Sequence, residues 1–123
     1  MVAARIRGKE FPLCLTVAAL DRINDKCGGL SGLNAFLTGD GNGSRAMVNT
    51  AWLLGLLIQE GEEHRLVEAR FSGEPAERIA VPAPEDIAHL LTYGEIRGYY
   101  SLVWQAVNAS LSRAIEAEPG KNG

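Results

Sequence analysis

The chain has 123 residues, enough for one domain but too few for a second independent core. Hydrophobic residues make up 46% and charged residues 22% of the sequence, a balance that excludes a disordered chain. The formal net charge of -3 argues against binding to a phosphate backbone, which needs a clustered basic surface, so we expect no nucleic acid partner.

Targeting signals and metal-binding cysteines are not expected either. The first residues carry charges where a signal peptide has its apolar core, and the longest apolar run, 46–58, is too short to cross a bilayer. We therefore expect neither export by a signal peptide nor a place in the membrane. Cys14 and Cys27 lie too far apart for paired metal-ligand spacing and are interpreted as reduced thiols.

A β-hairpin is predicted at the N-terminus, within residues 1–15. Apolar and polar side chains alternate over 4–15, with a break at Gly8-Lys9. Because glycine supplies the positive φ of a tight turn, the break marks the turn. Pro12 has no N–H to donate, which places its strand at a sheet edge.

The first helix is predicted from Val17 to Cys27. Thr16 offers a side-chain oxygen as N-cap, and Gly28-Gly29 ends the helix. We expect its apolar face, which includes Leu20, to pack on the hairpin.

A second, short helix is expected after Ser31, its N-cap, and ends at Thr38-Gly39. The glycine-rich residues 39–44 are predicted to form a loop. Ser44 then caps the most apolar helix of the chain, which is apolar on all sides and is therefore expected to be central and buried. Gly61 is expected to end or bend this helix.

Residues 62–83 are predicted to form a mobile, variable region. Its first part is compatible with a helix, but the Ser-Gly-Glu-Pro sequence at 72–75 must interrupt it. Pro84 is expected to begin the next helix, because proline suits the first helical position. Residues 92–94 are expected to end that helix.

The final helix is predicted from Glu95 to about Ala117, with apolar side chains over about half of its circumference. Tyr100 and Trp104, four residues apart, are candidates for an exposed aromatic patch of the kind enriched at protein interfaces. Residues 118–123 are expected to form a flexible tail. The predicted fold is mainly α, with a small N-terminal β-hairpin followed by about five helices in one compact domain, residues 1–117.

No catalytic or cofactor site is predicted from the motifs. Asp40, Asn42 and Ser44 alternate as the first ligands of a calcium loop do. Such a loop needs glycine where Arg45 stands and a bidentate glutamate where Ala51 stands, so we interpret these residues as a turn before a helix.

Two carboxylate and imidazole pairs stand at helical spacing: Glu60 with His64, and Asp86 with His89. Each pair supplies only half of a metal site. A small enzyme or metal protein built on these four side chains therefore requires the two pairs to converge, and we otherwise expect no metal.

Several segments follow one another in a recognisable order, namely a hairpin over 6–13, a helix that opens at 15–20 and ends in Cys-Gly-Gly29, an apolar helix over 51–61, a helix start at 81–87 and a long final helix. This order resembles that of the phage tail assembly chaperones of siphophages, prophages and gene transfer agents. The stretch 62–80 is longer and more charged than the family pattern.

The resemblance implies a non-catalytic protein of the bacterial host cytoplasm, and a homo-oligomer is a separate expectation. Such a protein binds the tape measure protein and helps to recruit tail tube protein. The alternative is a regulatory or adaptor protein that pairs through its C-terminal helix. We assign partner binding to side chains of the final helix and of the region before it: Tyr99, Tyr100, Trp104, Leu66 and Phe71.

Overall fold

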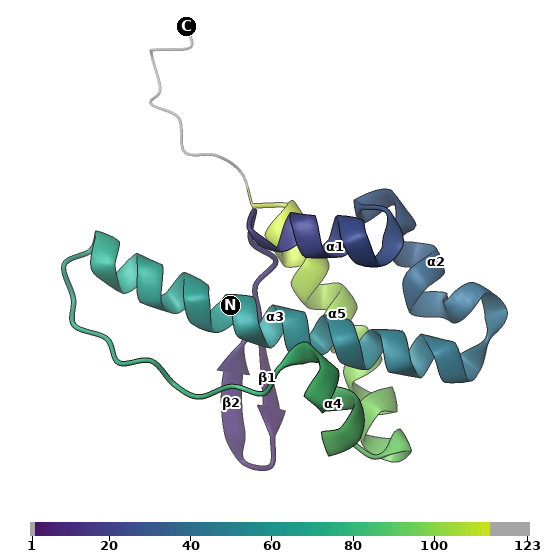
Figure 1. Ribbon diagram of the computed structural model, residues 1–123. Helices are drawn as coiled ribbons and strands as arrows, with labels where there is room; N and C mark the ends of the chain where they lie inside the picture. Colours follow the sequence, from purple (N-terminus) through teal and green to yellow (C-terminus); the bar gives the residue numbers. More distant parts are fainter. Residues whose placement is uncertain (1, 114–123) are drawn as a thin grey trace, which may run out of the picture.

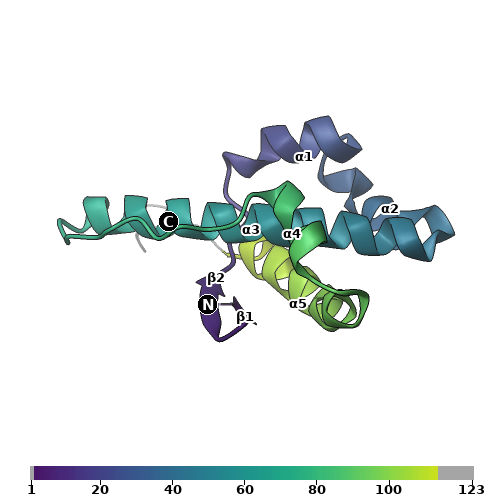
Figure 2. The same cartoon turned by 60° about the horizontal axis from the view of Figure 1, so that its bottom comes forward.

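Helix α3 (Gly43–Phe71) is the element around which the rest of the chain is arranged (Figure 1). The computed structural model describes residues 2–113. On one side of α3 lie α1 (Ala19–Cys27) and α2 (Leu33–Thr38), and on the other lie the hairpin and α5 (Tyr93–Leu111), while α4 (Pro84–Leu90) packs alongside (Figure 2). The predicted fold class, mainly helical with an N-terminal hairpin and five helices, is confirmed.

The hairpin consists of β1 (Ala3–Ile6) and β2 (Lys9–Pro12), which pair antiparallel. Arg7 and Gly8 form the turn with φ values of 47° and 80°, the two positive angles that a tight hairpin turn with the right twist requires. The turn therefore lies one residue before the predicted Gly8-Lys9. Within the described residues 2–113 the sheet consists of these two strands, so Pro12 lies in an edge strand, as predicted.

Helix α1 begins two residues later than predicted, although the Thr16 hydroxyl does accept a hydrogen bond from the Ala19 N–H at 3.3 Å. It ends at Gly28 in the left-handed conformation, as predicted. The expected packing of its Leu20 face on the hairpin is wrong, because α3 lies between the two elements (Figure 2). Ile23 is the fully buried large side chain of α1, and Leu20 is exposed.

The segments on either side of α2 are more helical than predicted. Ser31 does not cap α2 and instead lies within a short 3-10 turn that precedes it. A second 3-10 turn, Gly39–Gly41, replaces part of the expected loop. Asn42 and not Ser44 caps α3, because the Asn42 side chain accepts the Arg45 N–H at 3.0 Å.

The middle of α3 forms the centre of the core. Every residue from 50 to 58 is buried, and side chains of the hairpin, α1, α2, α4 and α5 join the same apolar cluster. This confirms the expectation that the helix with apolar residues on all sides is central.

Gly61 neither ends nor bends α3, contrary to the prediction, and the helix continues to Phe71. A Cβ at Gly61 would lie 1.9 Å from the carbonyl oxygen of Pro12, so only glycine lets the end of β2 pack directly on the helix backbone. The glycine is thus explained by a tertiary contact and not by a helix end.

Beyond the core, the end of α3 projects away from the body and the chain returns beside it (Figure 1). We call the returning residues 72–83 the strap, and residues 60–83 together the arm. The helix does stop at the predicted interruption, since Ser72 is its C-cap and Gly73 has a φ of 72°. The region expected to be mobile and variable therefore comprises the last turns of α3 and a strap with a defined path along them.

Helix α4 begins at Pro84, as predicted, and ends before Leu91. Residues 92–94, expected only to end α4, already start α5: Thr92 and Glu95 form a capping box in which the Glu95 carboxylate accepts the Thr92 N–H at 3.0 Å. Helix α5 ends at Leu111 and not at about Ala117. The predicted tail, 118–123, lies outside the described residues.

Candidate functional site

The connector between β2 and α1, residues 13–17, is held against α3 and α5 by hydrogen bonds. The Cys14 N–H donates to the Leu57 carbonyl at 3.2 Å, and the Leu15 N–H donates to the Ser110 hydroxyl at 3.0 Å. The Thr16 hydroxyl donates to the Glu60 carboxylate at 2.5 Å. These contacts fix an extended segment beside two helices.

A groove of about 880 Å³ opens over this connector. One wall is the arm, with residues 61–69 of α3 and 72–76 of the strap, and the opposite wall is the end of α5, residues 109–113. Leu13, Leu15 and Val17 contribute apolar surface to it. Val17, predicted as the first residue of α1, precedes the helix and is 85% exposed.

Charged side chains lie along the groove, mostly on the arm side. His64 pairs with Glu68 one turn later, and Glu74 of the strap has no side-chain hydrogen bond or ion pair within residues 2–113. Arg113 lies at the α5 side. The groove therefore combines apolar surface with two carboxylates, Glu68 and Glu74, and two arginines, Arg65 on the arm and Arg113 opposite.

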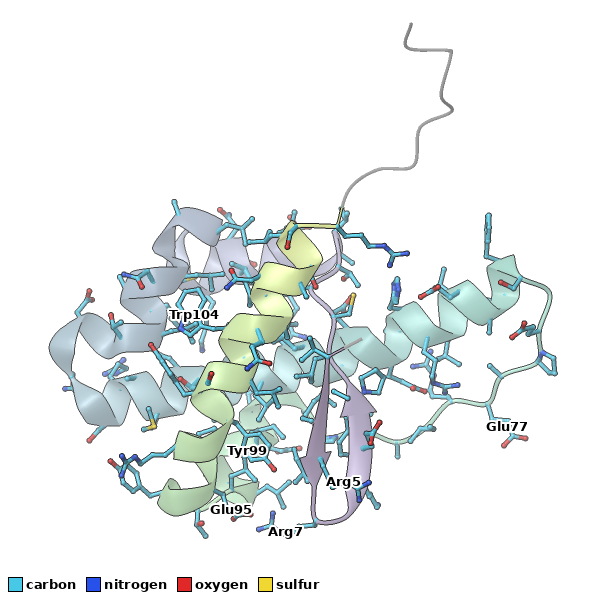
Figure 3. The ribbon with its side chains drawn as sticks, turned by 180° about the vertical axis from the view of Figure 1, so that it is seen from behind. Arg5, Arg7, Glu77, Glu95, Tyr99 and Trp104 are labelled. Atoms are coloured by element: carbon cyan, nitrogen blue, oxygen red, sulfur yellow. The ribbon has the colours of Figure 1, made fainter. Side chains whose placement is uncertain are left out.

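A buried carboxylate holds the strap in place. Glu62 is 3% exposed and accepts two hydrogen bonds from Arg65, at 2.9 and 2.8 Å, and one from the Ile79 N–H at 2.6 Å. Arg65 also donates to the carbonyl of Glu77, which lies on the strap far from α5 (Figure 3). The Arg65 hydrogen bonds and the Ile79 N–H lower the pKa of Glu62 against the opposing effect of burial.

The two cysteines are free thiols in different places. Cys14 lines the groove, and burial raises the pKa of its thiol while the Ser110 hydrogen bond opposes that shift. Cys27 lies at the end of α1, where its thiol donates to the Ile23 carbonyl at 3.4 Å. Only Cys14 can therefore report on the groove.

The five side chains predicted to bind a partner are not brought together. Phe71 is 94% exposed at the end of the arm, whereas Leu66 is only 9% exposed and packs inside. Tyr99, Tyr100 and Trp104 are half-buried against the core on α5, and the Tyr99 hydroxyl donates to the Arg5 carbonyl at 2.5 Å (Figure 3). The expected exposed patch of Tyr100 and Trp104 is therefore not formed, because both rings pack on the core.

Sequence reasoning missed the residues that build the groove. Val17, Ala69 and Ala109 come from three segments far apart in the chain and carry no motif. Their only shared property is small or medium apolar size. A tertiary structure is needed to bring them to one surface.

A smaller groove of about 220 Å³ lies between α3, α4 and the start of α5. Met47, Val48 and Ala88 line it, together with Tyr93, which is 66% exposed. This second groove has no acidic side chain in its lining.

The hypothesis of a metal site on two carboxylate and imidazole pairs is not supported. Within residues 2–113, no three histidine, cysteine, aspartate or glutamate side chains come together as metal ligands would. Glu60 instead accepts the Thr16 hydroxyl, and His64 pairs with Glu68. The two pairs therefore do not converge.

Comparison of the chain with protein-family models, curated proteins and solved structures gives no significant match in any of the three. No helix within the described residues has both the length and the apolar character needed to cross a membrane. The exposed surface of the molecule is therefore the remaining guide to function.

Proposed function

We propose that this chain is a non-catalytic chaperone for phage tail assembly, which acts in the bacterial host cytoplasm. It binds apolar helical surface of the tape measure protein and helps to recruit tail tube protein. The observation that carries the proposal is the groove of about 880 Å³ between the arm and the end of α5. The order of elements, which resembles that of the chaperone family, supplies the identity of the client.

The size of the groove suits a helical client. An α-helix with its side chains is about 10 Å across, so it fills about 80 Å³ per Å of length. The groove of about 880 Å³ therefore holds roughly two helical turns if they are fully enclosed, and about four if they are half enclosed.

Apolar side chains in the groove favour the same function. Leu13, Leu15 and the exposed Val17 line it. A single exposed apolar residue needs no explanation, but apolar surface gathered around a concave site is typical of protein binding. A chaperone that shields a client helix uses such a surface.

The second candidate is a regulatory or adaptor protein that pairs through its C-terminal helix. Tyr100 and Trp104 do not favour it, because both are half-buried against the core and leave little surface for a partner. Tyr93, at the start of α5, is exposed beside the second groove and would carry such a contact.

Co-expression with the tape measure protein encoded near its gene tests the proposal. The chain, carrying an affinity tag, should retain the tape measure protein through purification and keep it out of the insoluble fraction. Equal amounts of insoluble tape measure protein with and without the chain would count against the chaperone function.

A further inference from the structure

We infer that the groove selects a basic amphipathic helix, whose cations meet Glu68 and Glu74 while its apolar face lies on the connector. This inference rests on the proposed function, because it names the chemistry of the client segment. It rests on where the negative charge lies and on which carboxylates of the arm have a partner within the chain.

The negative charge of the chain is concentrated on the arm. Residues 60–83 contain six glutamates and three arginines, a net charge of -3, and the whole chain also has a formal net charge of -3. The rest of the sequence therefore has nine acidic and nine basic residues. The excess negative charge that attracts a cationic client therefore lies on the arm.

Three of the six glutamates of the arm, Glu60, Glu62 and Glu63, are already engaged within the chain, and Glu77 does not line the groove. Arg65 and the Ile79 N–H satisfy Glu62, and Arg78 pairs with Glu63. The Thr16 hydroxyl donates to Glu60. These groups hold the arm together and offer little to a client.

Glu68 and Glu74 are the two carboxylates that line the groove. Glu68 faces only His64, and Glu74 has no side-chain partner among the described residues. The positive groups of the lining are Arg65, which Glu62 neutralises at 2.8 Å, and Arg113 on the opposite wall. The arm side of the groove therefore attracts cations, and a client helix is oriented with its basic edge toward the arm.

The natural client segment can be replaced by a designed probe. A peptide of leucine and lysine at helical spacing, about 18 residues long, has an apolar face and a basic face over about five turns. Its twin, with glutamate in place of every lysine, has the same shape and the opposite charge. The pair separates charge selection from apolar binding.

Cys14 reports occupancy of the groove directly. In the full chain with Cys27→Ala, the rate of alkylation of Cys14 is measured with and without each peptide. The leucine-lysine peptide is expected to slow alkylation about tenfold, and the leucine-glutamate twin is expected to leave it unchanged. Equal protection by both peptides would overturn the charge selection. Protection without peptide that rises with the concentration of the chain would show that a second copy occupies the groove, and would overturn the inference.

Charge variants test whether Glu68 and Glu74 bind the cations of the peptide. Glu74→Gln is expected to weaken binding of the leucine-lysine peptide about twofold to fivefold, the range of an exposed ion pair, and addition of Glu68→Gln should weaken it further. Asp25→Asn removes the same charge from an exposed position on α1 outside the groove and serves as the control. Equal weakening by Asp25→Asn and Glu74→Gln would show that net charge alone attracts the peptide, and would overturn the assigned site.

Two alanines give a matched test of which groove binds. Ala109 on α5 lines the large groove and Ala88 on α4 lines the small one, and both are exposed helical residues. Ala109→Arg is expected to abolish protection of Cys14 by the peptide, and Ala88→Arg to leave it intact. The reverse result overturns the inference.

The same variants separate this inference from the proposed function. If the tape measure protein co-purifies equally with Ala109→Arg and with the unchanged chain, the chaperone function stands and the assigned groove is wrong. If it never co-purifies, yet the leucine-lysine peptide binds the groove as described, the groove chemistry stands and the identity of the client is wrong.

Discussion

At the residue scale, Gly61 and Glu62 decide how the arm leaves the core. Gly61 lies against the Pro12 carbonyl, and Glu62 binds Arg65 and the strap. The two residues are adjacent in sequence but face different neighbours. Gly61 lets the hairpin pack on α3, and Glu62 holds the strap against α3.

Gly61→Ala is expected to lower the free energy of unfolding by about 1–3 kcal/mol, because its Cβ would force the hairpin away from α3. Intrinsic helix propensity favours the opposite sign by about 1 kcal/mol. Gly98→Ala in α5, where no atom lies within 4 Å of the added Cβ, is the matched control and should raise stability by about 0.5–1 kcal/mol. Denaturant unfolding of both variants measures the difference, and a gain in stability for Gly61→Ala would contradict the close contact.

Glu62→Gln is expected to flatten the dependence of stability on pH in the acid range. Because the folded pKa of Glu62 lies below its ordinary value of 4.5, the stabilisation is fully present above that value and is lost as the pH falls through the lowered pKa. The variant should therefore be less stable than the unchanged chain at neutral pH, with the difference shrinking in acid. Unfolding curves between neutral and acid pH test this, with Glu74→Gln as a control that leaves the Arg65 contacts in place.

At the scale of elements, local signals predicted helix ends well where a glycine adopts a positive φ, as at Gly28 and Gly39. They failed where a tertiary contact or a competing cap decides. Gly61 was expected to end or bend the helix, but it is glycine because the Pro12 carbonyl lies against it. Thr92 was expected to end a helix, but it caps the next one because Glu95 completes its capping box. Neither partner is identified by hydrophobic spacing.

Hydrogen bonds also connect the hairpin with α4 and α5, which are far from it in the sequence. Arg7 donates to the Glu95 carboxylate and to the Leu90 carbonyl, each at 3.1 Å. The Tyr99 hydroxyl donates to the Arg5 carbonyl, and Arg5, Arg7, Glu95 and Tyr99 lie at the same end of α5 (Figure 3). The hairpin is thereby held at its turn, through Arg7, and in β1, through Arg5.

Tyr99→Phe is expected to lower stability by about 0.5–1.5 kcal/mol, the net contribution of one hydrogen bond, and to speed hydrogen exchange in β1. Tyr93→Phe, which removes the hydroxyl of an exposed ring, should change neither. Amide exchange and thermal unfolding of the two variants provide the comparison. Equal exchange in both would mean that the Tyr99 hydroxyl does not hold the hairpin.

At the scale of the whole molecule, α3 is shared between a core and an arm, and the groove lies where they meet. The sequence indicated the buried centre of α3 through its apolar residues on all sides. Phe71, predicted to contact a partner, is exposed, and its contact stays a prediction. It placed Leu66 and Trp104 on the binding surface because amphipathic spacing does not reveal which apolar residues the fold itself covers. The groove depends on segments that only the tertiary fold brings together.

Phe71→Ala and Leu66→Ala should separate binding from stability within the arm. Phe71 is 94% exposed, so its truncation should leave the unfolding free energy unchanged within about 0.5 kcal/mol while weakening client binding. Leu66 is buried, so its truncation should lower stability by about 2–3 kcal/mol. Unfolding curves together with co-purification of the tape measure protein check both expectations, and unchanged co-purification with Phe71→Ala would remove that residue from the client surface.

The amount of tape measure protein that co-purifies with Ala109→Arg relative to Ala88→Arg tests the central claim most directly. The two variants add the same charge to exposed helical positions, one in each groove. If the client is held between the arm and α5, Ala109→Arg should lose the tape measure protein while Ala88→Arg retains it. Equal retention by both variants, with both folded, would contradict the account.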